Sequence, residues 1–180
     1  MRGIVFTEFF NMVGKVMSED MVDDIIDDCD LPNGGAYTQV GSYPHEEILS
    51  LVAALSNRSG VSVHDLCVAF GKHLFGVFIR GYPEMFEGYS CSLDFLESID
   101  QRIQGEVRKL YPDAELPMFF YNRPEEGVLD MRYVSKRPFG PLCVGLIEGC
   151  REHFGHDIEY TYEDNTPEEG SDLQFNVRQV

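Results

Sequence analysis

The chain has 180 residues, a formal net charge of −17, and 43% hydrophobic and 12% aromatic residues. This length suits one domain with a sizeable core, and the composition is too apolar for a disordered chain. The negative charge disfavours binding to nucleic acid and to anionic membrane surfaces; it is typical of a soluble surface and would also suit a docking face for a basic partner. No run of about 20 apolar residues occurs, so we expect a soluble cytoplasmic protein that does not span a membrane.

Helical spacing of apolar residues dominates the first two thirds of the chain. The predicted helices cover residues 4–17, 18–30, 45–60, 62–83 and 92–112. Ser18 and Ser62 are suitable N-caps, and Gly60 is a suitable C-terminal stop. The last of these helices is expected to end near Pro112, and the Gly- and Pro-rich segment 31–44 predicts a loop.

The pattern changes in the last third of the chain. Residues 117–138 contain two strand-like runs around a polar turn, which predicts a hairpin. Residues 139–154 return to helical spacing, and residues 157–180 predict two more strands around an acidic turn. Helices first, followed by strands with one helix between them, predict an α+β fold.

The segment YVSKR carries the most distinctive polar pattern. Tyr133, Ser135 and Arg137 follow one another at every second position, so on a strand they point to one face. A phenol, a hydroxyl and a guanidinium on one face are hydrogen-bond donors suited to a carboxylate. The same alternation also occurs on ordinary surface strands, so the pattern alone leaves both interpretations open.

Several segments together resemble one family. They are MRGIVFTEF, AFGKHLFGVF, FLESID with EVRKLYPDAELP, YVSKR and GLIEG, in that order. With these segments the chain resembles a haem-nitric oxide/oxygen binding (H-NOX) domain, the bacterial relative of the haem domain of soluble guanylate cyclase. The resemblance covers essentially the whole chain. It implies a single domain, in which a helical N-terminal subdomain (1–60) packs on an α+β subdomain with an antiparallel sheet (61–180), with haem between them.

The resemblance also implies roles for individual residues. Tyr133, Ser135 and Arg137 match the side chains that bind the two haem propionates, and Pro117 matches the proline that presses on the porphyrin. The matching pocket wall is apolar and comprises Val5, Phe9, Leu74, Phe78 and Leu146. Without the resemblance, these apolar residues would be interpreted as ordinary core.

The position of the distal hydrogen-bond donor is also apolar. Family members that bind O2 carry a tyrosine there, and Leu142 matches that position. Bound O2 depends on such a hydrogen bond far more than bound NO does. The resemblance therefore implies selectivity for NO.

The axial iron ligand is where this sequence departs from the family. Counting back from Tyr133 to the family histidine arrives at Gln104. The amide offers only a weak oxygen donor, so Gln104 is a weak or absent ligand for haem iron. His73 is a poor substitute, because it points away from its pocket-lining neighbour. A zinc site at Cys150, His153 and His156 is a remote alternative, since no further Cys or His follows.

Two functional hypotheses follow. The first is a haem-binding NO sensor that regulates a separate histidine kinase or cyclic-di-GMP enzyme in trans, with altered ligation that mimics the NO-activated state. The second is a haem-free protein-interaction module that has lost gas sensing; Arg137 would then be expected to lack a carboxylate partner. We expect no enzyme, because the sequence has no nucleophile elbow, phosphate loop or plausible catalytic triad.

Overall fold

The computed structural model describes residues 1–110 and 115–180, without the side chains of residues 102, 103, 106, 107 and 110. The helix end predicted at Pro112 lies outside the described residues. The α-helices are α1 (Gly3–Val16), α2 (Glu19–Asp27), α3 (His45–Ser59), α4 (Val63–Gly81), α5 (Ser92–Ser98), α6 (Gln104–Leu110) and α7 (Gly140–His153). A 3-10 turn, η1 (Pro83–Met85), lies between α4 and α5, and a π-helical segment, η2 (Ile99–Ile103), lies between α5 and α6. The strands are β1 (Met118–Asn122), β2 (Val128–Ser135), β3 (Ile158–Asp164) and β4 (Ser171–Gln179).

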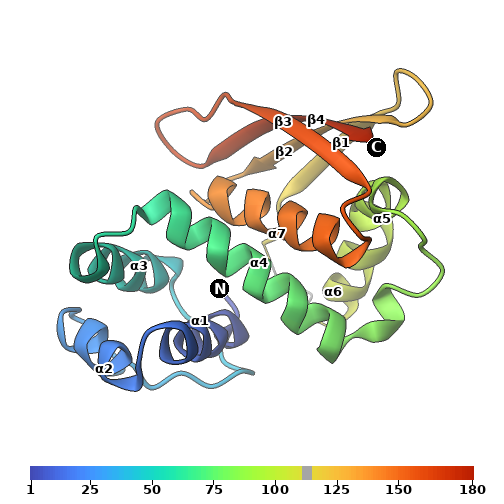
Figure 1. Cartoon of the computed structure of the whole chain (residues 1–180). Helices are drawn as coiled ribbons and strands as arrows, with labels where there is room; N and C mark the ends of the chain where they lie inside the picture. Colours follow the sequence, from blue (N-terminus) through green and yellow to red (C-terminus); the bar gives the residue numbers. More distant parts are fainter. Residues whose placement is uncertain (111–114) are drawn as a thin grey trace.

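The fold is α+β, as the sequence predicts. The four strands form one antiparallel sheet in the order β1-β2-β4-β3. Figure 1 shows the sheet on one side, α7 beneath it, α4 crossing the middle, and α1, α2 and α3 on the far side. Alternate residues of β2 and β4 are buried against the helices, as expected for a sheet with one covered face.

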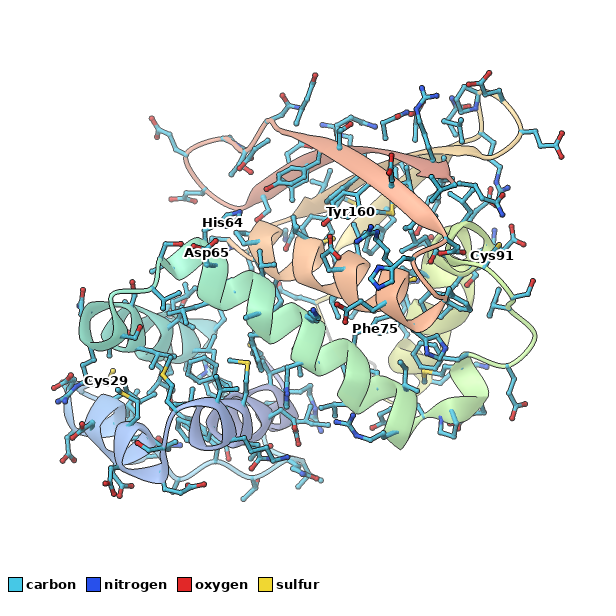
Figure 2. The ribbon with its side chains drawn as sticks, in the orientation of Figure 1. Cys29, His64, Asp65, Phe75, Cys91 and Tyr160 are labelled. Atoms are coloured by element: carbon cyan, nitrogen blue, oxygen red, sulfur yellow. The ribbon has the colours of Figure 1, made fainter. Side chains whose placement is uncertain are left out.

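Two hydrophobic clusters lie on either side of α4. The first lies among α1, α2, α3 and α4, and the second lies between the sheet, α5 and α7. Consecutive residues of α4 serve different clusters, because Leu74 belongs to the first and Phe75 to the second. Figure 2 labels Phe75 where α4 faces α7. The subdomain boundary at residue 60 stays a prediction.

Helices α4 and α7 approach each other through glycine residues. A Cβ atom added to Gly145 would lie 2.0 Å from the carbonyl oxygen of Val68, and one added to Gly71 would lie 2.2 Å from that of Leu142. Only glycine allows backbones to come this close. The crossing fixes the position of Leu142 and Leu146 on α7 relative to α4.

The helix predicted over residues 92–112 is interrupted. Residues Ile99–Ile103 form a π-helical segment, and the N–H of Gln104 donates to the carbonyl of Ile99. A π-turn adds one residue to a helical turn and occurs often at functional sites. It therefore sets the direction in which Gln104, the first residue of α6, points.

None of the helices in the described part of the chain is by itself long and apolar enough to cross a membrane. Helices α3 and α4 pass that test of length and composition only as a pair, and the pair is bent by 116°.

Candidate functional site

The end of β2 carries the predicted carboxylate-binding residues. Tyr133 is buried on the covered face and packs edge-on against Phe119, with ring centroids 5.4 Å apart. Burial raises the pKa of the Tyr133 phenol, so it remains a neutral donor at pH 7. Ser135 is the last residue of β2. The expectation that all three residues alternate along one strand is wrong for Arg137, which lies beyond the strand and donates its backbone N–H to Ser135 Oγ at 3.1 Å.

Arg137 has a carboxylate partner within the chain. Its Nη2 lies 3.0 Å from Oε2 of Glu115. The Arg137 side chain is 22% exposed and that of Glu115 is 65% exposed, so the pair lies at the rim of the site. The expectation that Arg137 lacks a carboxylate partner without haem is therefore wrong.

Gln104 is buried, with 4% of its surface exposed, and both ends of its amide are hydrogen-bonded. Nε2 donates to the carbonyl oxygen of Pro117 at 2.9 Å, and Oε1 accepts from Nη2 of Arg108 at 3.2 Å. The amide oxygen is the only atom of glutamine suited to bind a metal. That oxygen accepts a hydrogen bond from Arg108, so a metal ion would have to compete with Arg108 for it.

The register of the sheet brings these residues next to the carboxylate-binding residues. Met118 pairs with Val134 in the β1–β2 ladder, so Pro117 and Ser135 adjoin the same end of that ladder. The structure thus gathers Gln104, Pro117 and Ser135 from three separate segments of the chain. That they contact haem stays a prediction.

The apolar residues predicted to line the pocket lie together in the first hydrophobic cluster. Phe9 and Leu74 are buried, and the others are partly buried and pack against the same cluster. The complete set is Val5, Phe9, Leu74, Phe78, Leu142 and Leu146. Leu146 also packs against the second cluster, which includes Tyr133. Their role as a pocket wall stays a prediction.

His73 and His153 contact side chains outside the predicted site. His73 Nε2 lies 3.1 Å from Oε2 of Glu8, and the two side chains are 19% and 14% exposed. His153 lies among aromatic rings, including Phe75 and Phe154. Within the described residues, no three or more His, Cys, Asp or Glu side chains form a group that could hold a metal ion.

Sequence reasoning missed two residues of this site. Arg108 stands four residues after Gln104, and helical neighbours at that spacing contact each other, so the sequence held a signal for it. Glu115 stands far from Arg137 in the chain, and no local pattern pairs the two.

The donor chemistry fits the organic part of a haem and fits the iron poorly. Tyr133, Ser135 and Arg137 are suited to propionate carboxylates, and the aliphatic and aromatic wall is suited to a porphyrin ring. At position 104, the predicted position of the iron ligand, the chain carries a hydrogen-bonded amide and not the imidazole, thiolate or phenolate that haem iron prefers.

Comparisons with known proteins agree on one family. A family model described as haem-NO-binding matches residues 2–162. The unliganded Fe(II) H-NOX protein from K. algicida is 36% identical, with a TM-score of 0.93 over 100% of this chain and 97% of that one. The IWP-051-bound H-NOX from Shewanella woodyi in the Fe(II)CO state is 39% identical, with a TM-score of 0.85 over 100% of this chain and 95% of that one.

A more distant structure has the same fold. The H-NOX protein from S. oneidensis in the Fe(II)NO state is 22% identical, with a TM-score of 0.85 over 99% of this chain and all of that one. A search of curated proteins found no match. H-NOX domains bind haem and act as gas sensors rather than as catalysts. Since the family model spans most of the sequence, the chain belongs to the H-NOX family of haem-based gas sensors.

Proposed function

We propose that this chain is a haem-binding H-NOX domain selective for NO, in which the proximal helix, α6, is held by hydrogen bonds instead of an iron bond. The observation that carries this proposal is the hydrogen bonding of the Gln104 amide: its nitrogen donates to the Pro117 carbonyl, and its oxygen accepts from Arg108. In the resemblance on which this proposal rests, NO breaks the iron–histidine bond and releases that helix. A chain without the bond adopts the NO-activated arrangement with or without NO.

The carboxylate-binding residues support retention of haem. Tyr133, Ser135 and Arg137 are all present at the end of β2 or just beyond it, and each is a donor of the kind a propionate requires. Bound haem would supply the gas-binding iron. The chain's own residues would anchor the propionates and exclude water from the ring through the apolar wall.

The distal side supports NO over O2. Leu142 occupies the position where a donor would stand, and it packs against the cluster that includes Leu74 and Phe9. An aliphatic side chain cannot donate a hydrogen bond to a bound gas. This matters little to Fe–NO and a great deal to Fe–O2.

We propose that the output is the regulation of a separate cytoplasmic enzyme, a histidine kinase or a cyclic-di-GMP enzyme, and that the domain itself catalyses nothing. The chain would contact that enzyme in trans. If the proximal side is already released, wild-type protein should regulate its partner equally with and without NO. Gln104→His should restore dependence on NO.

A spectroscopic experiment tests the altered ligation. Haem stoichiometry is measured by pyridine haemochrome after reconstitution with haemin, and the reduced spectrum is recorded for wild type, Gln104→His and Gln101→His. Only Gln104→His is expected to give the five-coordinate histidine spectrum, because the Pro117 carbonyl is placed to orient a ring N–H at that position. Gln101 is exposed on η2 and controls for adding a histidine. A histidine-type spectrum from wild type would contradict the proposal.

One observation favours a second candidate function, a haem-free interaction module. Glu115 already supplies Arg137 with a carboxylate, so this arginine does not by itself require a propionate. Absence of haem from the purified chain, and failure to take it up from haemin, would favour this candidate. Near one haem per chain would exclude it.

A further inference from the structure

We propose that Glu115 is a built-in competitor for the carboxylate site of Arg137 and thereby sets how tightly the chain holds haem. The inference rests on the proposed function, because it takes the haem propionates as the ligands of Tyr133, Ser135 and Arg137. Glu115 lies outside the YVSKR segment, so the inference adds a new residue to those that determine haem affinity.

The backbone of Arg137 is held by hydrogen bonds, whereas the side chain of Glu115 can move into solvent. The backbone N–H of Arg137 donates to Ser135 Oγ at 3.1 Å, and its carbonyl accepts from Ser171 Oγ at 2.9 Å. These bonds fix the arginine backbone at the end of β2. The Glu115 side chain, by contrast, is 65% exposed and returns to water at little desolvation cost.

Glu115 is presented to the arginine by the segment that also carries Pro117. The Pro117 carbonyl accepts from Gln104, so the segment is tied to α6 on one side and to Arg137 on the other. A carboxylate on the same chain has a high effective concentration at its partner. A haem propionate must therefore compete with the Glu115 carboxylate for Arg137.

The competition follows from guanidinium chemistry. One guanidinium fork holds one carboxylate in the strong bidentate arrangement. A second carboxylate nearby repels the first, because both carry negative charge at neutral pH. Glu115 contacts the guanidinium through Nη2, at 3.0 Å, so a propionate gains that nitrogen only by displacing Glu115 or by sharing it at reduced strength.

The test compares haem affinity in a set of matched variants. Haem-free protein is titrated with haemin, and haem loss is timed by transfer to excess apomyoglobin. The variants are Glu115→Gln, Glu126→Gln, Arg137→Ala and the double variant Glu115→Gln with Arg137→Ala. Glu126 is exposed at the β1–β2 turn, at the other end of the hairpin, so its variant removes the same charge away from the site.

Glu115→Gln is expected to tighten haem binding by about two- to five-fold, the range typical of an exposed ion pair. The gain should vanish in the Arg137→Ala background and be absent from Glu126→Gln. Unchanged or weaker binding by Glu115→Gln, while Arg137→Ala weakens binding, overturns the competitor role and leaves the proposed function standing. An equal gain from Glu126→Gln overturns it as well. If Arg137→Ala leaves haem binding unchanged, the propionate assignment fails, and the inference fails with it.

Discussion

The side-chain amide of Gln104 donates a 2.9 Å hydrogen bond to the carbonyl oxygen of Pro117, and this bond joins α6 to the segment that leads into β1. The two residues come from opposite sides of the undescribed residues 111–114. The bond is partly buried, with Gln104 itself buried. It therefore stabilises the local structure in the absence of a cofactor.

Removing this amide should destabilise the haem-free protein. Gln104→Leu keeps a similar size and removes a partly buried hydrogen bond to the Pro117 carbonyl, which costs about 0.5–1.5 kcal/mol. Urea unfolding of haem-free protein measures the loss. Gln101→Leu, at an exposed position of η2, should change the free energy of unfolding little. Equal losses in the two variants would show that the hydrogen bond contributes nothing specific.

The glycine contact between α4 and α7 should not tolerate a side chain. Gly145→Ala places a Cβ atom 2.0 Å from the Val68 carbonyl oxygen, so the helices must separate, and overpacking of this kind costs about 1–3 kcal/mol. Gly81→Ala, at the end of α4, has open space around the new methyl group. It should leave stability unchanged or raise it slightly. Thermal unfolding of the two variants decides, and a neutral Gly145→Ala would contradict the close crossing.

Acid should weaken the link between α5 and the β1–β2 hairpin. Hydrogen bonds from Arg123 lower the pKa of Asp94, so the folded state binds this proton less readily than the unfolded chain does. The stabilisation is therefore complete above the unfolded value of about 3.9 and is lost as pH falls through the lower folded pKa. In Arg123→Gln, NMR titration should show the pKa of Asp94 moving up toward its ordinary value. A pKa of Asp94 that stays low would contradict this assignment.

Thiol reactivity should divide the five cysteines into two groups. Burial raises the pKa of Cys67 to about 11 and that of Cys150 to about 12, and Cys143 is also buried and raised. Cys29 and Cys91 are partly exposed and lie far apart in Figure 2. Burial raises the pKa of all five thiols to some extent, so exposure decides, and iodoacetamide should modify only Cys29 and Cys91 in the native protein, and all five after unfolding. Peptide mass spectrometry identifies the labelled positions, and early labelling of Cys143 would contradict the packing of α7.

Local signals in the sequence predicted the helix ends well. Ser18 accepts from the N–H of Met21, and Ser62 accepts from the N–H of Asp65, as N-caps do. Gly60 has a φ of 74° and ends α3 in the left-handed conformation. Each of these features depends on three or four neighbouring residues. Such short-range chemistry is visible in a single sequence.

Interactions between distant segments were not visible in the same way. The helical pattern over residues 92–112 gave no sign of the π-turn before Gln104, because tertiary contacts decide where such an extra residue is accommodated. Strand alternation predicted Tyr133 and Ser135 on one face but could not show that β2 ends before Arg137. The partner of Arg137 depends on how residues 115–117 return to the sheet, which is a property of the whole fold.

Helix α4 contributes Leu74 to one hydrophobic cluster and Phe75, the next residue, to the other. Neither cluster can lose this helix without exposing the apolar side chains of both, so the two clusters should melt in a single cooperative transition. Circular dichroism and tyrosine fluorescence are therefore expected to report the same midpoint for the haem-free chain. Residues 1–60, expressed alone, would lack the helix that covers their core and should not fold.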